Sequence, residues 1–531
     1  MGNSRSQASV AAGHPEVAAS AAQILRDGGN AVDAAIAGTL TSFISEVALT
    51  GPFGGGFALV GGAEAEPRAF DFFADVPGRD APEIDLATID FHAVEVSFGP
   101  TSQVFHVGRG AVAMSNALSG LLALHRTYGS LSIEAISAPA IRISREGTVL
   151  TPQTRMVMGI LEPILRYTPE SDALFAPEGV LPEVGERLAN PDLANLLEGL
   201  AGGHDPAHSA ALAESFGRPG GLIGASDVDA YRVKERHPIH IELKGHTLVF
   251  NPPPSSGGLL IAFGLKLLER LPESLWRDDI ESTRALLAAM STTIRARRAE
   301  LDVAVHNTDR STESFEEEFL SQTYLDRWWP TFEHARAHGP DPDPIHEPQT
   351  PGNTTHISVI DNNGLGCSLT SSNGEGCGTL VPGTGAQGNN FLGESDLNPS
   401  GFHANPVGVR LTSMMCPTLV LRDGRPLYAL GSGGSNRIRT ALLQVLVHRL
   451  FRGQPIHDSV HGPRLHYEHD TLFIERESGG ISIERPLIDA LRCTSVVEFA
   501  QPSMFFGGVH LASAIGQGAA DPRRQGTVEQ I

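Results

Sequence analysis

Two threonines and a histidine begin an alternating segment deep inside the chain, and this is where the residue types first suggest chemistry. The segment "PGNTTHISVIDNNGLGCSLTSS" spans residues 351–372, with Thr354-Thr355-His356 at the start of a predicted strand. Threonine is a common strand residue, so a loop that enters a sheet is one interpretation. The other is a nucleophile, because a threonine hydroxyl becomes reactive when a base lies beside it.

A threonine at a chain terminus carries such a base itself. The α-amino group titrates at about 7.7–8.0, so part of it is neutral near pH 7 and can accept the hydroxyl proton. To create this terminus, the bond between Asn353 and Thr354 must break. The hydroxyl of Thr354 can attack the preceding carbonyl, and water can then open the resulting ester. The preceding stretch "HGPDPDPIHEPQTPGN" is polar and proline-rich, and we expect it to be exposed and mobile.

A glycine pair further along the chain could stabilise the developing charge. The segment "ALGSGGSNRI" (429–438) reads as a strand that ends at Gly433-Gly434. Backbone N–H groups at such a turn can hold the oxyanion of acyl transfer, and glycine permits close approach. The alternative is a strand-to-helix turn with Ser435 or Asn436 as the N-cap. The two interpretations are compatible.

Ser372 ends the strand that follows the Thr354 segment. If these two strands form a hairpin, the hydroxyl of Ser372 can approach Thr354. The alternative is an ordinary surface serine.

The elements around these residues indicate helices on either side of stacked sheets in one large domain. Residues 15–50 predict two helices joined by a tight turn, and "GPFGGGFALVGG" predicts a glycine-rich turn into a strand. "AFDFFADVPGRDAP" predicts a strand and turn. Residues 130–330 are mostly helical, apart from a hairpin at "HPIHIELKGHTLVF", and strands dominate after residue 354, with a hairpin turn at "LRDGRPL".

Composition limits the classes of partner. The 531 residues carry 39 basic and 61 acidic side chains, for a net charge of −22, which argues against nucleic acid. The four cysteines, at positions 367, 377, 416 and 493, show no C-x-x-C spacing. We expect free thiols in a reducing compartment and no metal site. With no secretory signal and no apolar run of about 20 residues, a cytoplasmic protein without a membrane span is expected.

Seven segments together resemble the γ-glutamyltransferase (glutathione hydrolase) proenzymes of the N-terminal-nucleophile hydrolase superfamily, over nearly the whole chain. In order, they are "HPEVAASAAQILRDGGNAVDAAIA", "GPFGGGFALV", "PPPSSGG", "TTHISVID", "NN" at 389–390, "SMMCPT" and "GSGGSNRI". The resemblance implies an α+β fold, a four-layer αββα sandwich of two antiparallel sheets flanked by helices. It also implies self-cleavage before Thr354, giving a large subunit of residues 1–353 and a small subunit of 354–531 within one structural domain.

The same resemblance assigns roles to particular residues. Thr354 takes the place of the nucleophile, and Ser372 stands where the family has a second, assisting threonine. Gly433 and Gly434, with Ser435 beside them, cover the oxyanion-hole diglycine. No cofactor is implied.

The substrate-binding positions depart from the family pattern. Phe73, in Asp71-Phe72-Phe73-Ala74, stands at the place of an arginine that binds a carboxylate by two hydrogen bonds, which a phenyl ring cannot do. The other changed positions are Gly374 and Phe391 in place of polar residues, Glu394 in place of aspartate, and Ser413-Met414 in place of a serine pair. Three other arginines near pocket segments (Arg79, Arg109 and Arg410) are expected to be structural or on the surface.

These observations favour a self-processing threonine amidohydrolase or acyltransferase. It would release a γ-glutamyl or related small acyl group from an amide through an ester on Thr354. One alternative is a relative with an altered pocket in specialised-metabolite biosynthesis, acting on a non-γ-glutamyl substrate, including C–C hydrolysis that releases an oxalyl-type unit. Another is a non-catalytic binding homologue. The expected partner is a small molecule, with two chains from one precursor and a homodimer of these heterodimers as the candidate assembly.

Overall fold

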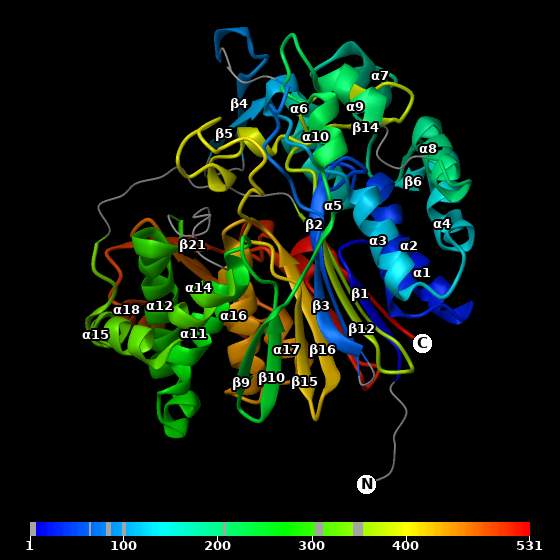
Figure 1. Cartoon of the computed structure of the whole chain (residues 1–531). Coiled ribbons are helices and arrows are strands. Elements are labelled where there is room, and N and C mark those ends of the chain that lie inside the picture. Colours follow the sequence, from blue (N-terminus) through cyan, green and yellow to red (C-terminus); the bar gives the residue numbers. More distant parts are fainter. Residues whose placement is uncertain are drawn as a thin grey trace.

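Two antiparallel sheets lie face to face, and helices cover the outer face of each (Figure 1). The structure is a computed structural model, and it describes residues 7–62, 65–80, 86–97, 102–204, 209–302, 312–342 and 354–531. Both sheets are assembled from segments far apart in the sequence. The predicted four-layer αββα arrangement is confirmed.

The first sheet has seven strands, and all its neighbouring strands are antiparallel. In spatial order, they are β24 (Thr527–Gln530), β1 (Ser9–Ala12), β11 (Thr355–Ile360), β12 (Gly366–Ser372), β2 (Gly55–Gly62), β3 (Ala65–Asp71) and β8 (Lys234–Arg236). The strand that follows Thr354 therefore lies near the middle of this sheet.

The second sheet has six strands and is also antiparallel throughout. Its order is β23 (Gly518–Ala520), β22 (Gly508–Ser513), β16 (Arg425–Gly433), β15 (Thr418–Arg422), β10 (His246–Phe250) and β9 (Ile239–Leu243). The diglycine that the sequence places at a strand end lies at and just after the end of β16, which is also central.

Strand alternation directs successive side chains of β11 to opposite layers. Ile357 and Val359 pack into the core beneath the helices, whereas Ile360 joins the core between the two sheets. Both faces of β11 are buried, and apart from His356 the strand is apolar or small and polar.

Helices α1 (Pro15–Arg26) and α2 (Ala31–Ser45) cover the first sheet, with α3 (Ala117–Tyr128), α4 (Ile133–Glu146) and α8 (Pro191–Ala201) beside them (Figure 1). Every residue of α2 is buried, as expected of a helix that is rich in alanine and apolar nearly all round. A Cβ at Gly38 would lie 2.4 Å from the Ile357 side chain, so glycine lets α2 lie directly on β11. The predicted pair of helices over residues 15–50 is confirmed.

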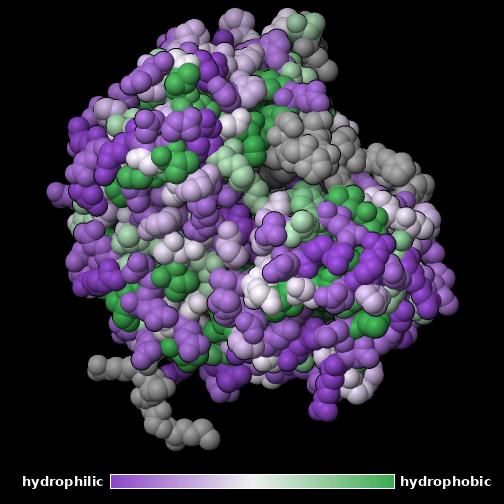
Figure 2. Space-filling model, turned by 180° about the vertical axis from the view of Figure 1, so that it is seen from behind, coloured by the Kyte–Doolittle hydropathy of each residue, from purple (hydrophilic) through white to green (hydrophobic). Residues whose placement is uncertain are grey.

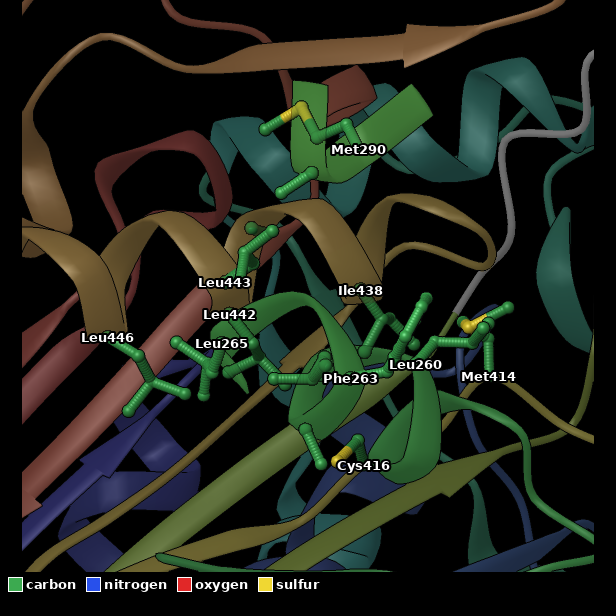
Figure 3. Close-up of a cluster of buried hydrophobic side chains, with 14 of the residues drawn as sticks. Leu260, Phe263, Leu265, Met290, Met414, Cys416, Ile438, Leu442, Leu443 and Leu446 are labelled. Carbon is green, nitrogen blue, oxygen red and sulfur yellow. The ribbon is translucent and has the colours of Figure 1, made fainter. Parts of the chain in front are cut away.

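The outer layer on the second sheet consists of α11 (Gly257–Glu269), α12 (Asp279–Ala296), α14 (Thr312–Phe319), α15 (Gln322–His338), α16 (Arg437–Leu450) and α17 (Ile456–His461). Leucines of α11 and α16 interlock with Met290 of α12 in one apolar cluster, and Met414, Cys416 and Ile438 lie at its edge (Figure 3). This cluster is the larger core of the molecule.

Smaller elements complete the chain. The short helices are α5 (Pro152–Ile160), α6 (Glu162–Leu165), α7 (Pro169–Phe175), α9 (Ser209–Phe216), α10 (Ala225–Ala230) and α18 (Arg485–Ala490). The remaining strands are β4 (His92–Ser97), β5 (Ser102–Val107), β6 (Thr148–Val149), β7 (Arg187–Leu188), β13 (Leu380–Val381), β14 (Ala386–Gln387), β17 (Leu465–Glu468), β18 (Thr471–Glu475), β19 (Glu477–Ser478), β20 (Ile481–Ser482) and β21 (Ser495–Phe499).

Both predicted hairpins are present. Lys244 and Gly245 join β9 to β10 with φ of 52° and 73°, and Asp423 and Gly424 join β15 to β16 with φ of 52° and 74°. Two residues with positive φ are what a tight hairpin turn needs. Helix α14 lies within the region predicted to be mostly helical (130–330), and α15 continues past the end of that region to His338. The expected mobile approach to Thr354 falls mainly on residues 343–353, outside the described part of the chain.

The surface in Figure 2 is mainly hydrophilic, with hydrophobic residues in patches between. Within the ranges given above, no helix is long and apolar enough to cross a membrane. All four cysteines are free thiols, as their spacing predicts.

Candidate active site

A pocket lies at the start of β11, between the two sheets and the helices around the second sheet, with an empty volume of about 450 Å³ that includes the solvent at its mouth. Its lining residues are Phe73, Arg297, Thr354, Ser372, Phe391, Glu394, Asp396, Leu397, Thr412, Ser413, Met414, Met415, Ser435, Asn436 and Ile438. Most of the predicted site residues are therefore gathered in one place. Of the rest, Gly374, Gly433 and Gly434 lie immediately behind the wall, and Asn353 lies outside the described residues.

Thr354 immediately precedes β11 and is 5% exposed. The β11–β12 ladder pairs Thr355 with Ser371, so the next position along the ladder sets Ser372 opposite Thr354. The hairpin that the sequence predicted is present. The hydroxyl of Ser372 accepts a hydrogen bond of 3.0 Å from the backbone N–H of Gly374, which fixes the chain as it leaves β12.

The backbone carbonyl of Thr354 is held from two sides. Nη1 of Arg524 donates to this oxygen at 2.9 Å. A Cβ at Gly433 would lie 2.0 Å from the same oxygen, so only glycine allows β16 to approach so closely. The diglycine thus lies against the predicted nucleophile. The structure also adds Arg524, a residue that sequence reasoning missed because it lies 170 positions away.

The chain turns sharply after the diglycine. Gly434 has φ +124° and Ser435 has φ +48°, and the hydroxyl of Ser435 donates to Asp396. Asn436 occupies the N-cap position of α16, as the alternative interpretation expected. Its side chain does not cap the helix, because it accepts a 3.0 Å hydrogen bond from Nη1 of Arg297.

One wall of the pocket is aromatic. The ring of Phe73 is 0% exposed within the protein, lies 4.8 Å from the ring of Phe391 and stacks on Phe57 at 5.5 Å. The Phe73 carbonyl accepts a 2.7 Å hydrogen bond from Arg410, and its N–H donates to Asp71 at 3.0 Å. The phenyl ring is therefore an integral part of the apolar core, held by its backbone as well as by stacking.

The opposite side of the pocket is acidic. Glu394 is buried, and its Oε1 has no hydrogen-bond partner among the described residues. Burial, reinforced by the nearby charges of Glu375 and Asp396, raises the pKa of Glu394 well above its ordinary value. A Cβ at Gly374, where φ is +61°, would lie 2.0 Å from Oδ1 of Asn390 and 2.5 Å from Oε1 of Glu394. Glycine at 374 thus leaves room for these two side chains.

The arginines named from the sequence do not line the pocket. Arg410 is buried in ion pairs with Asp71 (2.9 Å) and Asp75 (2.7 Å), and Arg109 donates to backbone carbonyls. Arg79 lies 3.8 Å from Asp227 and is part-exposed. All three therefore have structural or surface positions, as predicted.

Arg297, just after α12, is the cation in the pocket lining. Its Nε donates to Asp302 at 2.9 Å, so its charge is already compensated. The sequence "IRARRAEL" gave no signal that separates Arg297 from its neighbours.

Ser413 presents its hydroxyl at the pocket, where it accepts a 3.1 Å hydrogen bond from the N–H of Met415. The thioether of Met414 occupies the place where the sequence resemblance implies a second hydroxyl. This part of the wall is therefore half polar and half apolar.

The other two residues of the Thr-Thr-His segment have different surroundings. Thr355 donates at 2.7 Å to Oε2 of Glu46, at the end of α2. Both ring nitrogens of His356 are hydrogen-bonded at 2.8 Å, to Thr370 and Ser358, and burial lowers its pKa well below the ordinary value. His356 is thus a neutral structural histidine. Glu46 is a second residue near the nucleophile that sequence reasoning missed.

Comparison of the sequence with known proteins gives matches over most of the chain. The family model described as gamma-glutamyltranspeptidase matches residues 18–531. The chain is 29% identical to an acylase ACY 1 proenzyme from Pseudomonas sp. (strain SE83), over 89% of this chain and 84% of that protein. It is 26% identical to the glutathione hydrolase proenzyme of Escherichia coli, over 85% of this chain and 80% of that protein.

Among solved structures, the fold is similar to a cephalosporin acylase from Bacillus halodurans, with a TM-score of 0.80 and 21% identity over 99% of this chain and 96% of that one. This likeness concerns the fold, whereas the family model matches nearly all of the sequence. The chain therefore belongs to the gamma-glutamyltranspeptidase family, as an enzyme with the αββα fold of N-terminal-nucleophile hydrolases.

Proposed function

We propose that the protein is a self-processing N-terminal threonine hydrolase that transfers a small acyl group from an amide to water or an amine. The observation that carries this proposal is the position of Thr354 in the pocket, opposite Ser372 and in contact with the diglycine. Two similar proteins are named proenzymes, which supports formation of two chains from one precursor.

Maturation would begin when the Thr354 hydroxyl attacks the carbonyl carbon of Asn353. The bond from that carbon to the Thr354 nitrogen breaks, which leaves an ester on the hydroxyl and a free α-amino group. Water then hydrolyses the ester, giving a carboxyl terminus at 353 and an amino terminus at 354. The large subunit would be residues 1–353, and the small subunit 354–531.

Acyl transfer would use the new terminus as nucleophile and base. The neutral α-amino group takes the hydroxyl proton while the oxygen attacks the acyl carbonyl. The turn at Gly433 and Gly434 supplies backbone N–H groups for the oxyanion, and the hydroxyl of Ser372 assists the nucleophile. The amine of the substrate leaves with the proton, and water or a second amine then releases the acyl group from Thr354.

The pocket favours an acyl group without an anionic head. Phe73 and Phe391 form an apolar wall, and Glu394 and Asp396 contribute acidic groups. The cation in the pocket lining, Arg297, is already paired with Asp302, so a carboxylate in this space would lose its water with little compensation. We infer an acyl group with an apolar part against Phe73 and an amine or other hydrogen-bond donor toward Oε1 of Glu394.

A second candidate is C–C hydrolysis that releases an oxalyl-type unit in specialised-metabolite biosynthesis. The observation in its favour is Arg297, which gives the pocket lining a cation for such a unit. The compensation of this charge by Asp302 makes it the weaker of the two candidates.

Assay of a panel of chromogenic anilides with the purified, processed protein distinguishes the two candidate functions. We expect amine-bearing apolar acyl anilides to be turned over at least tenfold faster, in kcat/KM, than γ-glutamyl anilide. Faster turnover of γ-glutamyl anilide would contradict the inferred acyl group. If no anilide is turned over and oxalate is released from a suitable diketo acid, the second candidate is favoured.

A further inference from the structure

A second pocket lies behind the nucleophile end of β11, on the side of the helices that cover the first sheet. Its empty volume, which includes the solvent at its mouth, is about 360 Å³. Its lining residues are Gly13, His14, Glu46, Ala48, Leu49, Thr151, Gln153, Thr154, Val157 and Arg524. We call it the rear pocket. Arg524 links it to the active site, because its Nη1 donates to the carbonyl of Thr354.

The rear pocket contains an unusual concentration of buried polar atoms without partners. Among the described residues, Nε and Nη2 of Arg524, Oε1 of Glu46 and Nε2 of His14 make no hydrogen bond. The residues are 4%, 6% and 3% exposed, respectively. Buried polar groups are nearly always satisfied, so four such atoms around one cavity indicate an occupant.

The free atoms of Arg524 have the geometry of an anion site. Nε–H and Nη2–H lie on the same edge of the planar guanidinium and form the pair that binds both oxygens of a carboxylate. Nη1 is already used by Thr354, so this edge can bind an anion without disturbing that contact. Burial lowers the pKa of Arg524 to about 10, which leaves the group charged at neutral pH.

His14 adds a third donor. Its Nδ1 accepts a hydrogen bond of 3.2 Å from the backbone N–H of Glu16, so the proton of the neutral ring lies on Nε2. Burial lowers the pKa of His14 to about 4, so the ring is neutral at physiological pH. Gly13 leaves the space open, since a Cβ there would lie 2.8 Å from Oε2 of Glu46.

We propose that the rear pocket is a binding site for a small monocarboxylate, of formate or acetate size, held by the free edge of Arg524 and by Nε2 of His14. Its occupant would fill the unsatisfied donors and fix Arg524 against the Thr354 carbonyl. The site does not use the Thr354 hydroxyl. Its existence is therefore independent of the reaction proposed above.

Glu46 makes this binding depend on protons. Burial raises the pKa of Glu46 to about 7, against the lowering effects of the Thr355 hydroxyl and the Arg524 charge. The other charged or titratable groups around this site are His14, His510 beside Gly13, and Asp521 and Arg437, which act on Arg524. Below pH 7, Glu46 is protonated and leaves Arg524 to the ligand. Above pH 7, its carboxylate repels the ligand and competes for the guanidinium.

The test is binding of ¹³C-formate to the full-length processed protein, followed by NMR line broadening at constant ionic strength. We expect saturable binding at pH 6 that is about tenfold weaker at pH 8, as follows from a single group titrating near 7. In the Glu46→Gln variant, the dissociation constants for formate at pH 6 and pH 8 should agree within twofold. The uncut Thr354→Ala precursor should bind as the wild type does, which separates this site from the proposed reaction.

Two variants test the donors. His14→Ala should weaken formate binding at pH 6 by about tenfold, which is roughly the contribution of one hydrogen bond to a charged group. Arg524→Lys keeps a charge but loses the two-pronged edge, so formate should no longer be preferred to chloride. Arg485→Ala, on an exposed part of α18, is the matched control and should bind normally. Absence of saturable binding, or binding indifferent to His14→Ala and to pH, would overturn the proposal.

Discussion

The two ends of the active-site pocket are built differently. At one end, which we call the nucleophile end because it holds the proposed nucleophile, Thr354 is positioned by the register of β11 and β12, by Gly433 and by a hydrogen bond from Arg524 to its own carbonyl. At the proposed acyl end, the wall is a set of side chains, with the ring of Phe73 stacked on Phe57 and tilted against Phe391. The first end depends mainly on the backbone, and the second on side-chain identity.

This difference explains how the family's chemistry and its substrate preference can separate. A change of side chain at the nucleophile end collides with backbone, as at Gly433, or removes the reacting group. A change at the acyl end replaces one packed surface with another and leaves the sheets intact. Phe73 adds to the core, so an altered wall also contributes to stability.

The largest effect is expected at the nucleophile. Thr354→Ala should leave a single 56.3 kDa chain on a denaturing gel and lower acyl transfer by about three orders of magnitude or more. Thr355→Ala is the matched control, because its hydroxyl contacts Glu46 and not the pocket, and this variant should still be cut. Two normal fragments from Thr354→Ala would show that Thr354 is not the nucleophile.

The Gly433→Ala variant tests the close approach of β16 to the Thr354 carbonyl at the nucleophile end of the pocket. The added methyl group would meet the Thr354 carbonyl at 2.0 Å, so the strands must separate, at a cost of about 3 kcal/mol in the free energy of unfolding, and processing should slow at least tenfold. Gly199→Ala in α8 is the control, since its nearest neighbour would be 3.9 Å away, and it should be neutral or slightly stabilising. If the two variants have the same free energy of unfolding in urea and the same rate of processing, then close backbone approach does not set the nucleophile end apart from the acyl end.

The acyl end is tested by comparing two stacked phenylalanines. Phe73→Leu and Phe57→Leu should each lower the free energy of unfolding by about 1–2 kcal/mol, because both rings are fully buried. Only Phe73 lines the pocket, so only Phe73→Leu should change the ranking of acyl anilides in kcat/KM, by about fivefold. An unchanged ranking for Phe73→Leu would show that this ring does not contact the acyl group.

Glu394 provides a smaller effect that depends on pH. Its raised pKa means that the folded state holds a proton that the unfolded state releases, so its contribution to stability is present at low pH and is lost as pH rises. Glu394→Gln removes this loss and should stabilise the protein more at pH 8 than at pH 5, by about 1–3 kcal/mol. Thermal unfolding at the two pH values measures this difference, and greater stabilisation at pH 5 would contradict the assigned direction.

The smallest effect is expected for Ser372→Thr. The variant keeps the hydroxyl that accepts from Gly374, so processing and activity should stay within about threefold of wild type, whereas Ser372→Ala should lose about tenfold. The rate of self-cleavage followed on gels measures both. Equal rates for the alanine and threonine variants would show that the hydroxyl at this position takes no part.

Much of the fold could be predicted because local signals agree with it. The apolar helix that became α2, the two-residue turns at Lys244-Gly245 and Asp423-Gly424, and the alternation of β11 each have a local physical cause. The part of α15 beyond residue 330 was not predicted. Its buried face rests on few apolar residues, such as Phe332 and Ala335, within an otherwise polar segment.

The sequence by itself determined the candidate nucleophile, the diglycine and the phenylalanine at position 73, where the family resemblance implies an arginine, since each is a residue type within a short motif. Tertiary structure alone decided which charges reach the pocket and its rear side. Arg297, Glu46 and Arg524 carry no local signal, and what distinguishes them is burial and a place in the lining of one of the two pockets. The physical reason is that covalent chemistry depends on residue type, whereas the electrostatic environment depends on which distant side chains are brought together and shielded from water.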